Sequence, residues 1–241
     1  MLRYRLLTFD VNNTLMRVRN SVGDQYRKVA KQFGVNIKAS DVNREFRIAY
    51  KDQLCRHPNF GVTTSQTTEQ WWSEVVHRTF HAAGCDCDKE TLDNVSSKLF
   101  NNFKTSQTWE TYPEVKEMLI FLNRNGIALG VLSNNDERLM SVMKAVDIAE
   151  HFAFILPSAL AKCEKPDAEF FNMALERLNI EPGLCAHIGD NVKLDYHAAR
   201  AVGMDAYLVD REGTLIEKHP EVNPVHVLSD ISDLEPLIFM Q

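Results

Sequence analysis

The stretch Leu6-Leu7-Thr8-Phe9-Asp10-Val11-Asn12-Asn13-Thr14 begins with an apolar, β-rich run and ends in an Asn-rich turn. This pattern predicts a strand that delivers Asp10 to the carboxyl edge of a sheet. Open α/β sheets bind ligands at that edge, so Asp10 is a candidate nucleophile. Asp followed by Asn is also ordinary turn chemistry, so the stretch needs support from elsewhere in the chain.

Three later segments give that support. Val131-Leu132-Ser133-Asn134-Asn135 is an apolar strand that ends in a hydroxyl. Glu164-Lys165-Pro166-Asp167 places a lysine just before a helix, and Ala186-His187-Ile188-Gly189-Asp190 ends another strand in an acid, with Asp195 five residues further on. Parallel strands bring such ends to one edge of a sheet.

In this order and spacing, the four segments resemble motifs I to IV of the haloacid dehalogenase superfamily, most of whose members are Mg-dependent phosphatases. The resemblance extends from about Arg5 to Asp210. One position departs from the pattern: family phosphatases have a second aspartate, the general acid/base, two residues after the nucleophile, and this chain has Asn12 there.

The resemblance implies that Asp10 attacks phosphorus and forms an aspartyl-phosphate. It implies a Mg²⁺ cofactor held by Asp10, the backbone carbonyl of Asn12 and Asp190, with Asp195 supporting these ligands. A carbonyl ligand does not depend on the side chain, so the metal site survives the change at Asn12. An amide cannot exchange a proton near neutral pH, so we expect slow turnover.

The resemblance also assigns the phosphate site. The hydroxyl of Ser133 and the backbone N–H of Asn134 would bind phosphate oxygens, and Lys165 would hold phosphate and nucleophile together. Taken singly, Ser133 could equally be a helix cap and Lys165 a solvated lysine. Thr14 would stabilise the turn through its hydroxyl, and Asn13 would tolerate a left-handed backbone where many members have glycine.

Short apolar runs alternate with helical patterns after the first strand, which predicts a parallel sheet. We expect an α/β fold with a doubly wound, Rossmann-like core at 1–15 and 109–241. Residues 16–108 have little strand signal and would form an inserted small helical unit, the C1 cap of the resembled superfamily. The expected strands are Arg5–Phe9, Ile127–Leu132, Phe152–Leu156, Leu184–Ile188 and Ala206–Val209; the expected helices of the cap are Val22–Phe33, Val42–Leu54, Gln66–Ala83 and Lys89–Phe103.

Composition limits the partners. The chain has 241 residues, 44% of them hydrophobic, and a formal net charge of −6. We therefore expect a small phosphorylated substrate or ligand and no nucleic acid or membrane, with a monomer as the default. Five cysteines without a CxxC pair favour a reducing compartment, and we expect a cytoplasmic protein without a cleavable signal.

Several alternatives stay open at this point. The chain could be a catalytically impaired member that binds a phosphorylated ligand or partner, because Asn12 removes the acid/base. It could be a dehalogenase, although those members place an aromatic residue at that position. Cys85 and Cys87 could join a histidine around a metal. Trp71 and Trp72 could stack on a substrate or simply form part of the helical unit's core.

Overall fold

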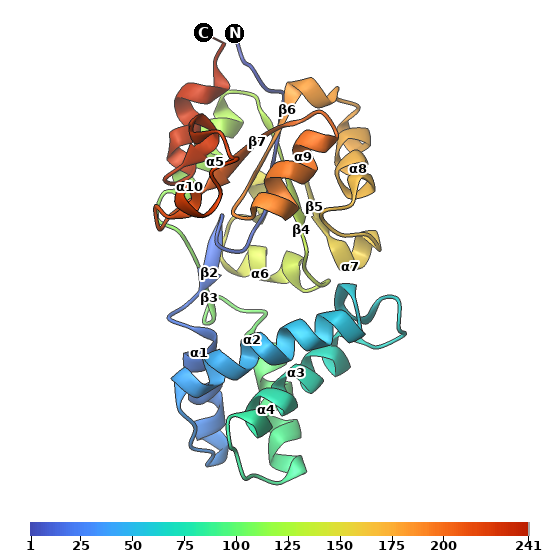
Figure 1. Ribbon diagram of the computed structural model, residues 1–241, viewed down its shortest axis with the longest axis vertical. Coiled ribbons are helices and arrows are strands. Elements are labelled where there is room, and N and C mark those ends of the chain that lie inside the picture. Colours follow the sequence, from blue (N-terminus) through green and yellow to red (C-terminus); the bar gives the residue numbers. More distant parts are fainter. Residues whose placement is uncertain (241) are drawn as a thin grey trace. The chain divides into compact units, whose positions relative to one another are not determined.

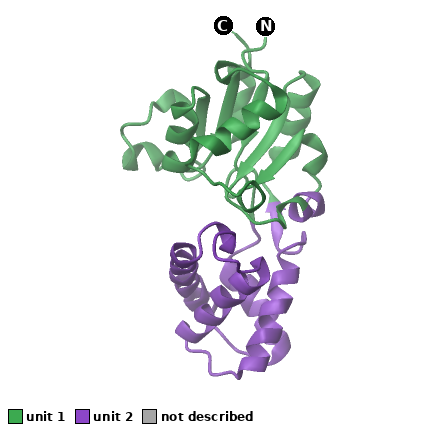
Figure 2. Ribbon diagram, turned by 90° about the vertical axis from the view of Figure 1, so that its right-hand side faces the viewer, with its two compact units in different colours: residues 1–17, 111–140, 147–241 green, residues 18–110, 141–146 purple. Residues whose placement is uncertain are grey.

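The computed structural model describes residues 1–240, which fall into two compact units (Figure 2). One unit comprises Met1–Arg17, Thr111–Met140 and the residues from Asp147 onward, and the other comprises Val18–Glu110 and Ser141–Val146. At the first two crossings, the chain passes between the units two residues later than the sequence pattern suggests. The short second piece of the helical unit, Ser141–Val146, was not expected.

The first unit is built on a six-stranded sheet in the order β5-β4-β1-β6-β7-β8 (Figure 1). Each neighbouring pair is parallel. The strands are β1 Leu6–Phe9, β4 Ala128–Ser133, β5 Phe154–Pro157, β6 Cys185–Gly189, β7 Asp205–Val209 and β8 Val227–Leu228. The prediction of an α/β fold with a doubly wound, Rossmann-like parallel sheet is confirmed.

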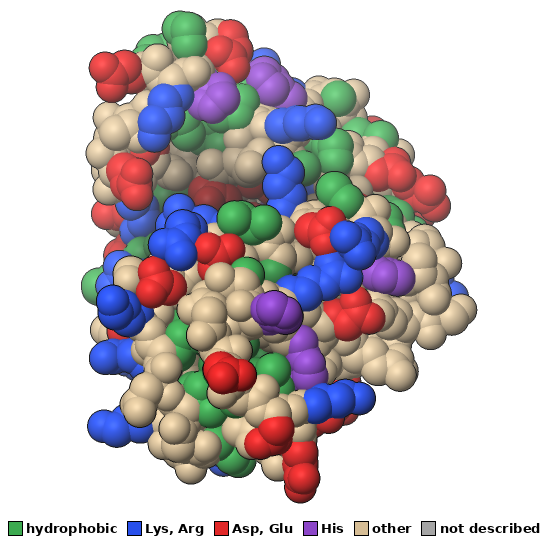
Figure 3. Space-filling view, turned by 60° about the horizontal axis from the view of Figure 1, so that its bottom comes forward, with side chains coloured by type: hydrophobic (Ala, Val, Ile, Leu, Met, Phe, Trp, Pro, Cys, Tyr) green, Lys and Arg blue, Asp and Glu red, His purple; other side chains and the backbone are tan. Residues whose placement is uncertain are grey.

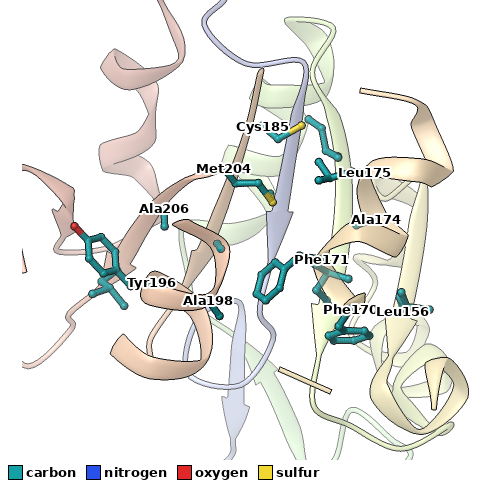
Figure 4. Close-up of a cluster of buried hydrophobic side chains, with 14 of the residues drawn as sticks. Leu156, Phe170, Phe171, Ala174, Leu175, Cys185, Tyr196, Ala198, Met204 and Ala206 are labelled. Atoms are coloured by element: carbon teal, nitrogen blue, oxygen red, sulfur yellow. The ribbon is translucent and has the colours of Figure 1, made fainter. Parts of the chain in front are cut away.

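Helices cover both faces of this sheet (Figure 1). They are α5 Val115–Arg124, α7 Ser158–Ala161, α8 Ala168–Leu178, α9 Ala198–Ala201 and α10 Leu215–Lys218, with a π-helical turn at Val192–His197. A further helix, α6 Leu139–Ala145, begins in this unit and continues into the short second piece of the helical unit. A sheet covered on both faces needs apolar residues in succession, which is why all four residues of β1 are buried. Figure 4 shows the cluster formed where Phe170 and Phe171 of α8 pack with Met204 and Leu175.

The centre of the sheet positions the candidate site. Strand β1 lies between β4 and β6, and its register pairs Phe9 with Val131 on one side and Ile188 on the other. The strand order reverses at β1, so its carboxyl end is the topological switch point where doubly wound sheets bind ligands.

The helical unit has its own apolar core. Its helices are α1 Val22–Ala30, α2 Ala39–Arg56, α3 Thr68–Ala82 and α4 Lys89–Asn102. Tyr26, Phe80 and Leu99 are almost fully buried in this core. Trp71 is also fully buried, and Trp72 packs against it with the ring centroids 5.0 Å apart. Trp71 is therefore part of the packed interior and offers no surface on which a substrate could stack.

Two short strands, β2 Met16–Val18 and β3 Trp109–Thr111, pair with each other where the chain leaves and re-enters the first unit. The tail ends, as expected, in a short helix, which is a 3₁₀ helix at Ile231–Ile238 with Pro236 inside it. Within residues 1–240, every helix is too short or too polar to cross a bilayer.

Candidate active site

Asp10 is the first residue after β1, and its backbone N–H donates to the Ile188 carbonyl at 2.8 Å. Its carboxylate is almost completely buried. Oδ1 accepts hydrogen bonds from Ser133 Oγ at 3.1 Å and from Lys165 Nζ at 2.7 Å. Among residues 1–240, no donor is bonded to Oδ2, so one oxygen is oriented by the protein and the other is available for chemistry.

Lys165 lies between two carboxylates. Its Nζ donates to Asp10 Oδ1 at 2.7 Å and to Asp195 Oδ1 at 2.6 Å, and only 3% of the residue is exposed. Burial by itself lowers the pKa of the ammonium, but the charges of Asp10 and Asp195 outweigh this effect and raise that pKa above its ordinary value. Lys165 is therefore a permanent cation beside the candidate nucleophile.

The side chain of Asn134 fixes the backbone of this lysine. Asn134 Oδ1 accepts from the Lys165 N–H at 2.8 Å, and Asn134 Nδ2 donates to the Lys165 carbonyl at 2.9 Å. Sequence reasoning considered only the backbone N–H of Asn134, so this clamp between the β4 loop and the lysine was missed. Just beyond Lys165, Asp167 caps α8 by accepting from the Glu169 N–H at 3.0 Å, so the lysine precedes a helix as the sequence predicts.

Asp195 has a supporting position. Its Oδ1 faces Lys165 and, at 3.0 Å, His187 Nε2, while its Oδ2 accepts from the Asn191 N–H at 2.9 Å. Burial alone would raise the pKa of Asp195, but the charge of Lys165 and the hydrogen bond from His187 hold it below its usual range. The carboxylate therefore stays ionised and ties Lys165 to the loop after β6.

His187 is completely buried behind this network. Its Nδ1 lies 2.8 Å from Thr8 Oγ1, and its Nε2 faces the ionised Asp195, so the ring donates through Nε2 and accepts from the threonine hydroxyl. Burial lowers the pKa of His187 despite the nearby carboxylate, so the ring is neutral near pH 7. Its signal in the sequence was a lone polar ring on a strand that is otherwise apolar.

Asp190 follows β6 directly, and its Oδ2 accepts from Asn13 Nδ2 at 3.1 Å. Burial and the negative charge of Asp10 raise the pKa of Asp190 to about 6. Asp10, Asp190 and Asp195 thus face one ammonium, that of Lys165, and this surplus of negative charge suits a divalent cation with oxygen ligands.

A cation at this place cannot rely on side chains alone. Among residues 1–240, no group of three or more His, Cys, Asp and Glu side chains could hold a metal ion. A cation bound here would therefore need a backbone carbonyl among its donors. The two hydrogen bonds of the bridge between Asn12 and Met16 use the Val11 carbonyl and the Asn13 N–H, and no donor within residues 1–240 is bonded to the Asn12 carbonyl.

The turn after Asp10 is held by its backbone. Leu15 and Met16 both donate to the Val11 carbonyl, at 2.9 and 3.1 Å, and Asn13 adopts the expected left-handed conformation with φ 59°. The expectation for Thr14 is wrong: its buried Oγ1 makes no hydrogen bond to any of residues 1–240, so the hydroxyl does not stabilise the turn. The same holds for the buried Oδ1 of Asn12.

Arg211 is a further residue of this turn that sequence reasoning missed. Its guanidinium donates to the carbonyls of Asn13 at 3.2 Å and Thr14 at 2.8 Å, and it pairs with Glu114 at 2.7 Å. It also stacks on the Tyr112 ring, 3.4 Å from the centroid. Arg211 stands almost 200 residues from the turn in the sequence, and no local pattern marks it.

Ser133 is the last residue of β4 and is fully buried. Its hydroxyl donates to Asp10 at 3.1 Å. In the turn that precedes α6, Asp136 Oδ1 accepts from the Arg138 N–H at 3.0 Å. Ser133 therefore lies in the site.

Two other arginines lie near the turn in the sequence. Arg17 stacks on Tyr112, and Arg19 pairs with Glu110 at 3.1 Å.

This fold and this cluster of acids and lysine define a haloacid dehalogenase-like hydrolase, and the chain belongs to that family, whose model matches residues 4–203. Its curated relatives include haloacid dehalogenase-like hydrolase domain-containing protein 3 of Mus musculus, which is 36% identical over 238 residues, or 98% of this chain and 94% of that protein. The Rhythmically expressed gene 2 protein of Drosophila melanogaster is 32% identical over 248 residues, with 98% and 95% covered.

The comparison with solved structures supports the fold. A structure described as a dehalogenase superposes with a TM-score of 0.73 at 22% identity, covering 99% of this chain and 98% of that one. The resemblance seen in the four motifs is therefore confirmed at the level of family and fold.

Replacing Gly189 should displace Asp195. A Cβ at Gly189 would stand 2.2 Å from Asp195 Cγ, so Gly189→Ala forces the buried carboxylate away from Lys165. We expect a loss of about 2 to 4 kcal/mol in the free energy of unfolding, measured with urea. Gly183→Ala is the matched control, because nothing lies within 4 Å of its Cβ. Equal stability of the two variants would contradict this packing.

Asp190→Asn should stabilise the metal-free protein at neutral pH. The folded-state pKa of Asp190, about 6, lies above its ordinary value of 3.8, so the stability linked to this group is present at about pH 4 and is lost as pH rises through 6. In EDTA we expect the variant to gain about 2 kcal/mol at pH 7.5 and little at pH 4. Asp147→Asn, on the surface, is the control and should change little. A variant less stable than the wild type at pH 7.5 would contradict the predicted direction of this change in stability.

Proposed function

We propose that the chain is a Mg-dependent phosphohydrolase that acts on a small phosphorylated metabolite through an aspartyl-phosphate on Asp10, slowly because Asn12 replaces the usual acid/base. The observation that carries the proposal is the buried contact of Lys165 with Asp10 and Asp195. Phosphoryl transfer depends on positioned charges around a nucleophile, and this contact supplies both.

The nucleophile has one reactive oxygen. Oδ1 of Asp10 accepts from Ser133 and Lys165, so Oδ2 forms the bond to phosphorus while the bond to the leaving oxygen breaks. The developing charge on the phosphoryl oxygens then faces the hydroxyl of Ser133 and the ammonium of Lys165. Asp195 acts through Lys165, which it keeps in place and charged.

The donor set fits Mg²⁺. Asp10, the Asn12 carbonyl and Asp190 would hold the ion, which when bound neutralises phosphate charge that the carboxylates would otherwise repel. In support, Asp190 is a carboxyl whose pKa is raised by burial and by Asp10, so a cation beside it would restore its ionised form.

Asn12 limits the rate in this proposal. An aspartate here would protonate the leaving alcohol and then deprotonate the water that cleaves the aspartyl-phosphate. The amide can only hydrogen-bond. Loss of proton transfer at this position lowers the reaction rate by about 10²–10⁴-fold, which corresponds to about 3 to 5 kcal/mol in the activation free energy. Substrates with good leaving groups would lose least, and hydrolysis of the aspartyl-phosphate would become the slow step.

The second candidate function, favoured by Asn12 itself, is a protein that binds a phosphorylated ligand or partner and does not turn it over. Mg-dependent hydrolysis of a phosphate ester above the rate of an Asp10→Asn variant distinguishes the two. Dehalogenation has less support, because the dehalogenases of the resembled superfamily place an aromatic residue where this chain has Asn12.

The charge of the protein bears on the class of substrate that we propose. The chain carries a net charge of −6, and on the face in Figure 3 Lys and Arg side chains are interspersed with Asp and Glu, which favours a small anionic substrate over nucleic acid. We also propose that the helical unit acts as a cap, that the protein is cytoplasmic and that it is a monomer.

Asn12→Asp should raise the Mg-dependent hydrolysis of p-nitrophenyl phosphate by at least about tenfold and add an acidic limb to the pH profile. Asn and Asp are nearly the same size, and Ser133 and Lys165 already contact Asp10. Initial rates with Mg²⁺ and with EDTA, together with Mg²⁺ affinity by calorimetry, provide the measurement.

Asp10→Asn in the Asn12→Asp background is the control and should abolish the gain. An unchanged or lower rate in Asn12→Asp, with Mg²⁺ affinity intact, would show that proton transfer at this position does not limit the wild type, and the proposal of impaired turnover would fail.

A further inference from the structure

Two cysteines of the helical unit face each other away from the site described above. Cys85 Sγ and Cys87 Sγ lie 2.8 Å apart in the turn between α3 and α4. Both sulfurs pack against the core of the unit, and both residues are partly exposed. No His, Asp or Glu completes a metal-binding group with them among residues 1–240, so the pair does not form the metal site considered from the sequence.

The turn holds the pair from both sides. Cys85 N–H donates to the Phe80 carbonyl at 3.0 Å, after Gly84 with φ +79°. On the other side, Asp88 caps α4 by accepting from the Thr91 N–H at 2.7 Å. Two residues of chain span at most about 7 Å, which keeps the two Cα atoms within the range that a disulfide requires.

A cavity of about 710 Å³ opens beside Cys85. Its lining contains four cations and one acid: Arg27, Lys28, Lys31, Lys38 and Asp41. Arg27 is paired with Asp24 at 3.6 Å, whereas no acidic side chain of residues 1–240 pairs with any of the three lysines. In a chain with a net charge of −6, this is a local concentration of positive charge next to a thiol.

We propose that Cys85 and Cys87 form a reversible dithiol–disulfide site, and that its oxidant is a small disulfide carrying carboxylates, which the cationic cavity binds. The volume is that of a small-molecule pocket. The lysines match the carboxylates of such an oxidant, and Cys85, whose sulfur lies 2.8 Å from that of Cys87, is part of the lining.

The exchange balances without another reagent. The Cys87 thiolate attacks one sulfur of the oxidant, whose S–S bond breaks, and the first thiolate leaves with the proton that Cys87 has given up. The Cys85 sulfur then attacks the Cys87 sulfur, forming the Cys85–Cys87 bond, and its proton goes to the second departing thiolate. The cysteines lose two electrons, and the oxidant gains them.

The order of attack follows from the surroundings of Cys85. Burial and the hydrogen bond with Cys87 raise the pKa of the Cys85 thiol to about 12. Cys85 therefore keeps its proton near pH 7 and acts second, as the resolving thiol, while the reactive species in exchange is a thiolate.

The test oxidises the full-length reduced chain with oxidised glutathione, an anionic disulfide, and with cystamine, a cationic one. After blocking of free thiols, peptide mass spectrometry should show that the peptide carrying both cysteines has lost two hydrogens, and that a reducing thiol reverses the change. Glutathione disulfide should react faster than cystamine, and added salt should narrow the difference. A peptide carrying glutathione on each cysteine, with no internal bond, would overturn the proposal.

Charge variants test the cavity. The double variant Lys31→Gln and Lys38→Gln should slow oxidation by glutathione disulfide by roughly tenfold and leave the cystamine rate unchanged or higher. Lys51→Gln with Lys98→Gln is the matched control, because both lysines are exposed on the same unit and neither lines the cavity. Equal rates in the two double variants would overturn the assignment of the oxidant to this cavity.

Discussion

The rest of the site depends on the burial of the Lys165 ammonium between the carboxylates of Asp10 and Asp195. A buried charge is costly unless it is paired and hydrogen-bonded, and here two anions at 2.7 and 2.6 Å share one cation. The pairing has a consequence for chemistry, because it fixes one oxygen of Asp10 and leaves the other without a donor among the described residues. It also explains the elements around it: Asn134 fixes the lysine backbone, and His187 fixes Asp195.

The sequence contained those parts of the site that lie at strand ends. Asp10, Ser133 and Asp190 follow apolar runs, and parallel strands bring their ends together, so their convergence could be predicted. The left-handed Asn13 was also predictable, because few residues tolerate that backbone. The contact between Lys165 and Asp195 spans 30 residues of sequence and depends on how a loop and a π-helical turn pack, which no periodicity encodes.

Other features could not be predicted for the same reason. Arg211 reaches the turn after Asp10 only because β7 delivers it to the same edge of the sheet, and Gly189 matters because Asp195 lies where its Cβ would be. Backbone hydrogen bonds and Arg211 hold the turn, so it does not require a hydrogen bond from the Thr14 hydroxyl. The helical unit was recognisable from its amphipathic pattern, yet the approach of Cys85 to Cys87 and the cations beside them required the three-dimensional turn.

If Asp10 is the nucleophile and its covalent intermediate is hydrolysed slowly, that intermediate accumulates and can be detected by its mass. The protein is mixed with p-nitrophenyl phosphate and Mg²⁺, quenched in acid and examined by intact-protein mass spectrometry. We expect one phosphoryl group on the wild type, none on Asp10→Asn and none when EDTA replaces Mg²⁺. An adduct of equal abundance on Asp10→Asn, or hydrolysis that proceeds at the wild-type rate in that variant, would contradict the central claim.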